Sequence, residues 1–407
     1  MEEKRTVLRR EYLKKLNGWR DRTDVAKVIT GMRRCGKSTL MMQFIQMLKD
    51  SGVPDSRILY LNLESQIAED IGDFRDLNAY IRGNMAEGRT YVFLDEVQMV
   101  NGWERTLNSL MVDYDADIYI TGSNAYLLSS ELATYISGRY VEIHMLPLSF
   151  QEYTELHPVD AEHNLESRFS DYIWFGSIPM AYPDDSIRSR DLLRGIYSTI
   201  IRKDVFTRVN VGDVRQLDEI TMFLFSNIGN ITSSSSIAKY TSMSPTTVKK
   251  YIQALEEAYI VYKAYRYDIR RKKHLKTLEK YYVADTGVRN AVLGNAKGTD
   301  ISRQIENLVY LELVRRGYDV SVGSYNDREI DFTATGYDSM QYVQVAQSVL
   351  DESVFEREIR SLRDIRDSYP KLVLTMDRVF SKAPDGIRVM NLIDWLLAID
   401  GSRQDVM

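Results

Sequence analysis

The sequence predicts an α/β protein whose N-terminal part is a doubly wound parallel sheet covered by helices. Between Val25 and about His144, short runs rich in β-branched residues alternate with longer amphipathic stretches, as in strands joined by crossover helices. A glycine-rich turn follows the first run, and two adjacent acidic residues end the third. Sheets of this kind bind ligands beyond the carboxyl ends of their strands, so both features lie where a ligand is expected.

Five strands are predicted for this sheet. They are VAKVIT from Val25, RILYLNL from Arg57, TYVFLDE from Thr90, DIYITGS from Asp117 and RYVEIHM from Arg139. Amphipathic segments such as STLMMQFIQMLKD, from Ser38, separate the strands and are long enough to form crossover helices. These elements make residues 1–147 the first predicted domain.

The turn after the first strand has the sequence GMRRCGKS and matches GxxxxGK[ST], the Walker A motif, in the required place between a strand and a helix. Its glycines let backbone N–H groups point at phosphate oxygens, and the start of the next helix attracts negative charge. Lys37 is expected to reach the β- and γ-phosphates of ATP, and the Ser38 hydroxyl is expected to bind Mg²⁺. The predicted nucleotide-binding residues are Gly31, Arg34, Cys35, Gly36, Lys37, Ser38 and Thr39.

A second motif, YVFLDEVQ, has the form of a Walker B motif. Its hydrophobic strand brings Asp95 to the carboxyl end of the sheet, where the carboxylate is expected to hold Mg²⁺ directly or through water. The adjacent Glu96 is expected to polarise the water that attacks ATP. Surface charge is the alternative, but a buried strand that ends in two carboxylates is costly unless a cation pairs with them.

Two further residues are candidates for the hydrolytic site. Asn124 follows the fourth strand and is expected to orient the attacking water, unless it is only the polar start of a turn. Arg139, in ISGRYVE, is expected to stabilise the transition-state charge from the same chain or from a neighbouring subunit. A surface ion pair is an equally good interpretation of this arginine.

These motifs carry a family resemblance. A widespread prokaryotic group of AAA-like ATPases is similar to the segments ITGMRRCGKSTLM, YVFLDEVQMVNGWE, ITGSNAYLLSSELATYISGRY and LPLSFQEY. The domain of unknown function usually attached to that group resembles FGSIP, KYYVADTGVRNAVLG, IENLVYLELVRRGYDV, REIDFTA and YVQVAQSVLDE, so the resemblance covers almost the whole chain. It implies a sheet with an extra strand and a catalytic glutamate, with Lys37, Ser38, Asp95, Glu96 and Asn124 on the corresponding positions. Relatives often form rings, so a homo-oligomer is also implied, with Arg139 acting across an interface.

Three more domains are predicted after the first. Residues 148–213 have a helical pattern and form a lid or linker. Residues 214–285 have the order helix, turn, helix and β-rich segment, which is typical of a winged helix. Residues 286–407 alternate helices and strands as a second, smaller α/β domain.

The winged helix carries a basic face that suits DNA. In TTVKKYIQALEEAY the apolar residues recur at helical spacing, which leaves the polar and basic residues outside. The stretch IRRKKHLK, from Ile269, is expected to form the tip of a β-wing whose affinity for phosphates weakens with salt. Winged helices also dock proteins, so a protein partner is the alternative. The predicted DNA-binding residues are Thr247, Lys249, Lys250, Arg270, Arg271, Lys272 and Lys273.

The last domain resembles a restriction-nuclease fold that has lost part of its site. Glu306 on a helix, Asp331 on a strand and Gln344 on the next follow the order acid, acid, Glu/Gln-x-Lys. Such sites use carboxylates to hold Mg²⁺ and a lysine to favour the hydroxide. The lysine position holds Ala346, so nuclease activity is not expected unless a lysine from elsewhere reaches the site.

Composition excludes several other classes. A single cysteine excludes an intramolecular disulfide, and the four histidines lack metal-ligand spacing. No apolar run approaches the ~20 residues that cross a bilayer, and the N-terminus lacks the apolar stretch of a signal peptide, so a cytoplasmic protein without membrane contact is expected. The sequence therefore predicts a Mg²⁺-dependent ATPase whose nucleotide state alters DNA or protein binding. A slow signalling switch with protein partners and an ATP-driven nuclease are the alternatives.

Overall fold

The computed structural model describes residues 6–398 except 124–137, 182, 184, 207–213, 296, 327, 380–383 and 385. The chain forms two compact units. The first comprises Met1–Pro147 with Glu257–Tyr259, and the second comprises Leu148–Glu256 with Ile260–Met407. The predicted domain limits stay predictions.

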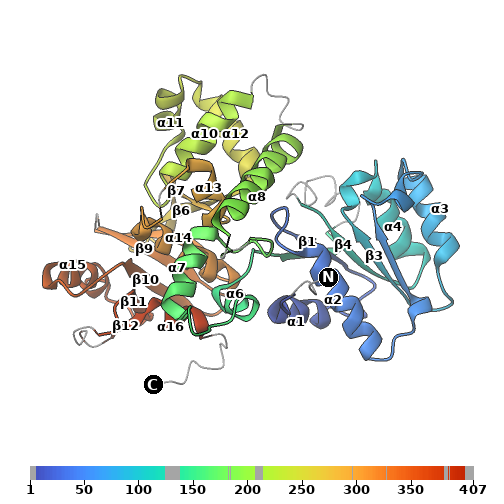
Figure 1. Ribbon diagram of the computed structural model, residues 1–407, viewed down its shortest axis with the longest axis horizontal. Helices are drawn as coiled ribbons and strands as arrows, with labels where there is room; N and C mark the ends of the chain where they lie inside the picture. Colours follow the sequence, from blue (N-terminus) through green and yellow to red (C-terminus); the bar gives the residue numbers. More distant parts are fainter. Residues whose placement is uncertain are drawn as a thin grey trace. The chain divides into compact units, whose positions relative to one another are not determined.

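The first unit is built on a five-stranded parallel sheet with the order β2-β3-β4-β1-β5, which confirms the predicted fold class (Figure 1). The strands are β1 (Ala26–Thr30), β2 (Ile58–Asn62), β3 (Thr90–Asp95), β4 (Ala116–Thr121) and β5 (Tyr140–His144). The helices are α1 (Arg10–Gly18), α2 (Lys37–Asp50), α3 (Phe74–Asn84) and α4 (Trp103–Asp113), with short 3-10 turns at Asp55–Arg57, Gln66–Ala68 and Val97–Met99. Because β4 lies between β1 and β3, the residues that follow these three strands meet at one edge of the sheet.

Two hydrophobic cores form because β1, β3 and β4 are buried along their whole length. Successive side chains of a strand point to opposite faces. Val92 and Leu94 therefore pack with α3 and α4, whereas Phe93 packs with α1 and α2. On that second face Phe93 and Tyr119 stack with ring centroids 4.7 Å apart. Burial on both faces explains why these strands read as continuous hydrophobic runs.

A buried ion pair lies at the start of the sheet. Lys27 on β1 donates to Asp117 on β4, and both side chains are fully buried. The Lys27 ammonium also donates to the backbone oxygens of Arg22 and Val25, at 2.7 and 3.0 Å. Burial lowers the pKa of Lys27, although the charge of Asp117 opposes that effect. The pair thus replaces water contacts that both charges lose on folding.

The second unit contains a seven-stranded mixed sheet with the order β12-β11-β10-β9-β8-β6-β7. Its strands are β6 (Val261–Asp268), β7 (Lys273–Val283), β8 (Asp319–Tyr325), β9 (Arg328–Thr335), β10 (Met340–Ala346), β11 (Lys371–Thr375) and β12 (Ile387–Asn391). The hairpin β6–β7 joins the later strands because β6 pairs with β8 in parallel. The strands predicted for the wing and for the last domain therefore share one sheet.

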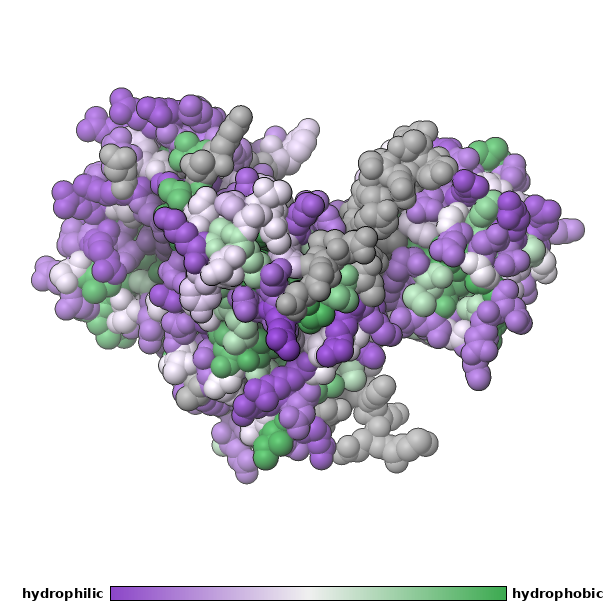
Figure 2. Space-filling model, turned by 90° about the horizontal axis from the view of Figure 1, so that it is seen from above, coloured by the Kyte–Doolittle hydropathy of each residue, from purple (hydrophilic) through white to green (hydrophobic). Residues whose placement is uncertain are grey.

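Helices before, within and after this sheet complete the second unit. They are α6 (Phe150–Leu156), α7 (Leu165–Phe175), α8 (Ser186–Thr199), the π-helix η5 (Ile200–Phe206), α10 (Val214–Ser226), α11 (Ser234–Thr241), α12 (Pro245–Glu257), α13 (Thr286–Leu293), α14 (Ile301–Arg315), α15 (Glu352–Arg363) and α16 (Leu392–Leu397). Most of α12 lies in this unit, which takes in residues up to Glu256. On the face shown in Figure 2, hydrophilic residues predominate and hydrophobic patches are small and scattered. Among the helices in the described part of the chain, none combines the length and apolar character that a membrane-spanning helix needs.

Candidate nucleotide site

The loop between β1 and α2 depends on two glycines. Gly31 has a φ of 143°, and a Cβ atom there would lie 2.1 Å from the backbone oxygen of Met145. Gly36 is the N-cap of α2 and has a φ of 106°. Side chains rarely adopt such φ values, so the geometry requires glycine at both motif positions. No described side chain caps the start of α2, so its first backbone N–H groups are available to an anion.

The motif lysine is held against this loop. Lys37 is 4% exposed, and its ammonium donates to the backbone oxygens of Gly31 and Met32 at 3.0 and 3.3 Å. An anion bound to the loop would therefore meet a positive charge already positioned beneath it. The other predicted loop residues differ in exposure: Arg34 and Thr39 are exposed, Ser38 is half-buried and Cys35 is buried.

Asp95 ends β3 as a fully buried carboxylate. Thr121, at the end of β4, donates its hydroxyl to one carboxylate oxygen, and Tyr60 on β2 donates to the other at 3.1 Å. Burial, followed by the negative charge of Asp95, raises the pKa of Tyr60 above its usual range, so this hydroxyl keeps the proton that it donates. Three neighbouring strands thus fix the acid that the sequence assigns to Mg²⁺.

The residue after Asp95 has an unusual backbone. Glu96 has a φ of 56°, in the left-handed region, and its N–H donates to the Thr121 hydroxyl at 2.9 Å. Gln98 donates its side-chain amide to the Glu96 carboxylate at 2.5 Å. Left-handed backbone at a residue other than glycine costs free energy and concentrates at functional sites. The turn directs Glu96 away from the strand and keeps its carboxylate half-buried.

Arg33, within the loop, was not singled out from the sequence. Its guanidinium lies 3.6 Å from the Glu64 carboxylate beyond β2 and donates to the Ser123 hydroxyl beyond β4 at 3.4 Å. The side chain therefore connects the loop to the ends of two other strands. No motif could have identified it, because both partners lie far away in the sequence.

Arg9 is a second residue that sequence reasoning missed. Its buried guanidinium donates to the backbone oxygen of Cys35 at 3.1 Å and to that of Leu146 at 2.7 Å. In the sequence it looks like one more charge in a polar N-terminus. Arg9 is buried because it immediately precedes α1, and α1 packs beside α2, the helix that follows the loop.

The structure does not bring Arg139 to the loop within one chain. Arg139 precedes β5, and its backbone oxygen accepts from the N–H of Ala26 at the start of β1. The loop lies at the other end of β1, which is about 16 Å away for a five-residue strand. The Arg139 guanidinium donates instead to Asn108 on α4 at 2.9 Å. Asn124 lies outside the described residues.

Mg²⁺ and ATP can be tested against these residues. In the described part of the chain, no set of three or more His, Cys, Asp or Glu side chains is arranged to hold a metal ion. Mg²⁺ needs no such set, because it is usually held by one or two protein ligands together with phosphate oxygens and water. Ser38 and Asp95 supply oxygens of the right kind, and the glycine loop supplies N–H groups for phosphate. The residues present fit Mg²⁺ with ATP.

The predicted DNA-binding residues lie on α12 and at the β6–β7 turn. Ser244 caps α12 by accepting from the Thr247 N–H at 3.1 Å. Val248, Tyr251, Ile252 and Leu255 are buried, as the helical spacing predicts for all but the tyrosine, while Lys249 and Lys250 are exposed. The tip residues Arg270, Arg271, Lys272 and Lys273 are also exposed.

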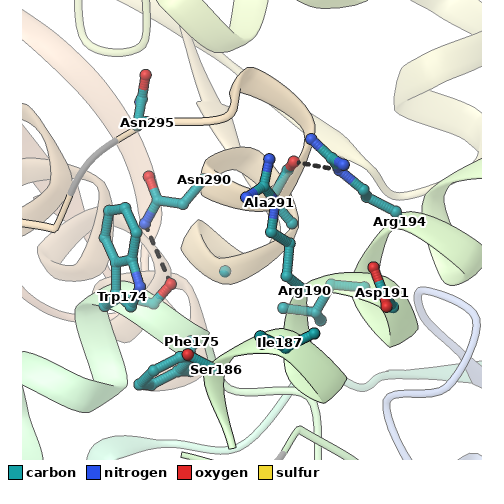
Figure 3. A pocket seen from close by; sticks show the side chains of 12 residues that line it. Trp174, Phe175, Ser186, Ile187, Arg190, Asp191, Arg194, Asn290, Ala291 and Asn295 are labelled. Carbon is teal, nitrogen blue, oxygen red and sulfur yellow. Dashed lines mark hydrogen bonds between the residues drawn. The ribbon is translucent and has the colours of Figure 1, made fainter.

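A cavity of about 470 Å³ lies in the second unit between α7, α8 and α13 (Figure 3). Trp174 and Phe175 line one side, and Arg190 and Arg194 line another. Arg194 donates to the backbone oxygen of Ala291 at 2.8 Å, so part of this lining joins α8 to α13. The residues that line it include none from the phosphate loop, Gly31–Ser38, so the cavity is separate from the nucleotide site.

Comparison with known proteins relates both units to described families. Residues 23–154 match the family described as AAA domain, and residues 166–299 match a domain of unknown function (DUF8612). An uncharacterized protein of Haemophilus influenzae is 39% identical over 402 residues, which cover 97% of this chain and 99% of that protein. An uncharacterized protein of Methanocaldococcus jannaschii is 29% identical over 359 residues, which cover 82% of this chain and 77% of that protein.

Two solved structures are similar at low identity. The ORC1 protein of Aeropyrum pernix, in complex with DNA, is 14% identical with a TM-score of 0.33, and the match covers 74% of this chain and 95% of that one. AMPPCP-bound DnaA of Aquifex aeolicus is 18% identical with a TM-score of 0.28, and the match covers 57% of this chain and 81% of that one. At these TM-scores the likeness carries no conclusion about what this chain binds.

Proposed function

Since the chain belongs to the same family as the Haemophilus influenzae protein and its residues 23–154 form an AAA domain, we propose that it binds ATP with Mg²⁺ and hydrolyses it. One observation carries the proposal: Lys37, Asp95 and Glu96 follow β1 and β3, whose carboxyl ends share one edge of the sheet. Each of these side chains is held by contacts from neighbouring elements. If either motif were a chance match, its residues would not need to lie at the same edge of the sheet as those of the other motif.

The chain's own residues account for binding. Phosphate oxygens would accept hydrogen bonds from the N–H groups of the loop and from the ammonium of Lys37. The Lys37 ammonium would then no longer donate to the backbone oxygens of Gly31 and Met32. Ser38 and Asp95 would hold Mg²⁺, which supplies positive charge to the phosphate oxygens. Arg34, Cys35 and Thr39 would contribute backbone contacts.

Hydrolysis requires a base for water, and Glu96 suits this role. Its carboxylate is half-buried and is oriented by Gln98, and its backbone is fixed to Thr121. The same threonine holds Asp95, so the two acids keep a constant relative position. Asn124 would orient the attacking water, and Arg139 would act on the site of a neighbouring subunit in a homo-oligomer.

We further propose that nucleotide state alters DNA binding through a winged helix built from α10, α11, α12 and the β6–β7 hairpin. The exposed cations of α12 and of the hairpin tip support this proposal, because phosphate contacts need accessible positive charge. A slow nucleotide switch that binds proteins through the same face is the second candidate.

The proposal is tested by steady-state ATP turnover of the full chain and of Glu96→Gln and Lys37→Ala. Glu96→Gln should retain ATP and lose about 10²-fold or more in turnover, because the amide is no base. Lys37→Ala should lose ATP binding itself. Equal turnover in the wild type and Glu96→Gln would remove Glu96 from the mechanism, and failure of the wild type to retain ATP with Mg²⁺ would end the proposal.

A further inference from the structure

The cavity of about 470 Å³ in the second unit has no part in the proposed ATP reaction (Figure 3). It is lined by the end of α7, by one side of α8 and by α13 with the residues that follow it. Its volume falls within the range of about 300–1,000 Å³ that small-molecule pockets occupy. Such pockets combine mostly apolar walls with a few polar groups that fix the ligand, and both are present in this lining.

The walls of the cavity are held in place by contacts between helices. A Cβ atom at Gly287 of α13 would lie 2.1 Å from the backbone oxygen of Phe175, so the close approach of α13 to the end of α7 requires glycine there. The Asn290 side-chain amide donates to the backbone oxygen of Trp174 at 3.3 Å and to the Gln304 side chain at 2.9 Å. Because these contacts fix the walls, a ligand would need to order little of the protein in order to bind.

Apolar and aromatic side chains form one part of the lining. Phe175, Leu193 and Ala291 are buried, and Trp174 is half-buried. Ile187 lines the cavity although it is 74% exposed. Covering this apolar surface with a ligand would remove it from water, which favours binding. The lining therefore suits a ligand with an apolar body.

Two cations of α8 form the other part of the lining. Arg190 and Arg194 are one helical turn apart, and a guanidinium nitrogen of each lies 3.9 Å from the place that a Cβ atom of Gly294 would occupy. Both cations thus lie beside the end of α13. Among the lining residues that the structure describes, Asp191 is the only acid, so positive charge exceeds negative charge.

The two arginines differ in what holds them. Arg194 donates to the backbone oxygen of Ala291 at 2.8 Å. In the described part of the chain, the Arg190 guanidinium has no hydrogen-bond partner, and neither arginine forms an ion pair. Like charges placed near one another repel, and an anion between them would relieve that repulsion. The Arg190 guanidinium is therefore available to an anion from solution.

The two parts together define the chemical class of the ligand. Guanidinium groups pair with the oxygens of a carboxylate, sulfonate or phosphate, and they do so more strongly than with neutral groups. Aromatic side chains pack well against an aromatic ring. A nucleotide matches less well, because its sugar would lie against apolar walls and leave its hydroxyl groups without partners.

We propose that this cavity binds a small organic anion with an aromatic body. The head group would lie at Arg190 and Arg194, and the body would lie against Trp174, Phe175 and Ile187. The inference is independent of ATP binding, because the lining contains no residue of the phosphate loop. A ligand that binds only the folded protein would also raise the melting temperature of the second unit.

The proposal is tested on the full chain with two fluorescent probes. Anilinonaphthalene sulfonate carries an anionic head on an aromatic body, and phenylnaphthylamine has the same rings without the charge. The sulfonate should bind at least about tenfold more tightly, because charge-assisted hydrogen bonds add to the burial of the rings. Lys37→Ala should bind both probes as the wild type does. Equal affinity for the two probes, or loss of sulfonate binding in Lys37→Ala, would overturn the proposal.

Variants of α8 locate the bound probe. Arg190→Met removes the charge but keeps a long side chain, and it should weaken sulfonate binding by about tenfold without affecting the neutral probe. Arg188→Met is the matched control, because Arg188 is an exposed cation of the same helix that pairs with Asp185 and does not line the cavity. Its sulfonate affinity should equal that of the wild type.

Ile187→Asp should weaken binding of both probes, because it removes apolar surface and adds negative charge. Ile187 is exposed, so this variant should fold even if Arg190→Met does not, and thermal melting checks the folding of each. Wild-type sulfonate affinity in a folded Arg190→Met or Ile187→Asp variant would overturn the proposal.

Discussion

The guanidinium of Arg9 donates to the backbone oxygen of Cys35, 3.1 Å away in the middle of the phosphate loop. A second bond from the same group reaches Leu146 at 2.7 Å. The residue before α1 therefore joins the phosphate loop to the segment that follows β5. A residue outside both nucleotide motifs thus belongs to the site as a positioning residue.

Arg9→Ala should weaken ATP binding without removing any atom that contacts ATP. Loss of one charge-assisted hydrogen bond costs about 1.5–3 kcal/mol, and 1.4 kcal/mol is about tenfold in affinity. We expect the dissociation constant for ATP to rise by about tenfold, measured by calorimetry with Mg²⁺. Lys14→Ala, an exposed cation on α1, is the control. Unchanged affinity in Arg9→Ala would show that the loop holds its shape without this support.

Glu96→Gly should stabilise the first unit while abolishing turnover. Glycine adopts a φ of 56° without the cost that glutamate bears, which is about 1 kcal/mol. Thermal melting should therefore rise as ATP hydrolysis falls. Ser242→Gly, at a φ of 54° in the second unit, should give a comparable gain with normal turnover. A lower melting temperature for Glu96→Gly would mean that the carboxylate's bond to Gln98 outweighs the backbone cost.

Lys27→Met should destabilise the first unit by about 3–5 kcal/mol, because it leaves Asp117 charged and buried without its cation. Urea unfolding measures the change. The double variant Lys27→Met with Asp117→Asn should recover part of the loss, since no uncompensated charge remains. Additive losses in the double variant would contradict the pairing.

Replacing Lys249 and Lys250 together by alanine should weaken DNA binding at every sequence tested. If both contact phosphates, the slope of log affinity against log salt should fall by about 2. Fluorescence anisotropy of labelled duplexes at several salt concentrations gives this slope. Arg363→Ala removes a cation from α15 and should leave it unchanged. An unchanged slope in the double variant would favour the protein-binding alternative.

Arg139→Ala should reduce turnover only if the arginine acts between subunits, because within one chain it lies at the wrong edge of the sheet. Arg139→Ala and Glu96→Gln are each expected to be inactive alone. Mixed together they should regain activity, since the second variant can lend its arginine to a site that retains Glu96. Absence of recovery, or normal turnover by Arg139→Ala alone, would refute this role.

Local patterns predicted the sheet, the loop and its two acids because each depends on adjacent residues. Gly31 to Ser38 form one turn, and Asp95 and Glu96 end one strand. Arg9 and Arg33 escaped prediction because their partners are distant in sequence and adjacent only after packing. Arg139 comes before its strand, and all strands of a parallel sheet begin at the same edge. The direction of the strand therefore implies that Arg139 lies at the edge opposite the loop.

The parallel pairing of β6 with β8 has a consequence for how this chain can be divided. A fragment that ends near residue 285 would lose β8 and leave β6 with a row of unsatisfied backbone groups. Such bare edges recruit strands from other molecules, so the fragment would be prone to aggregate. Genetic truncation at that point would thus produce a misassembling product.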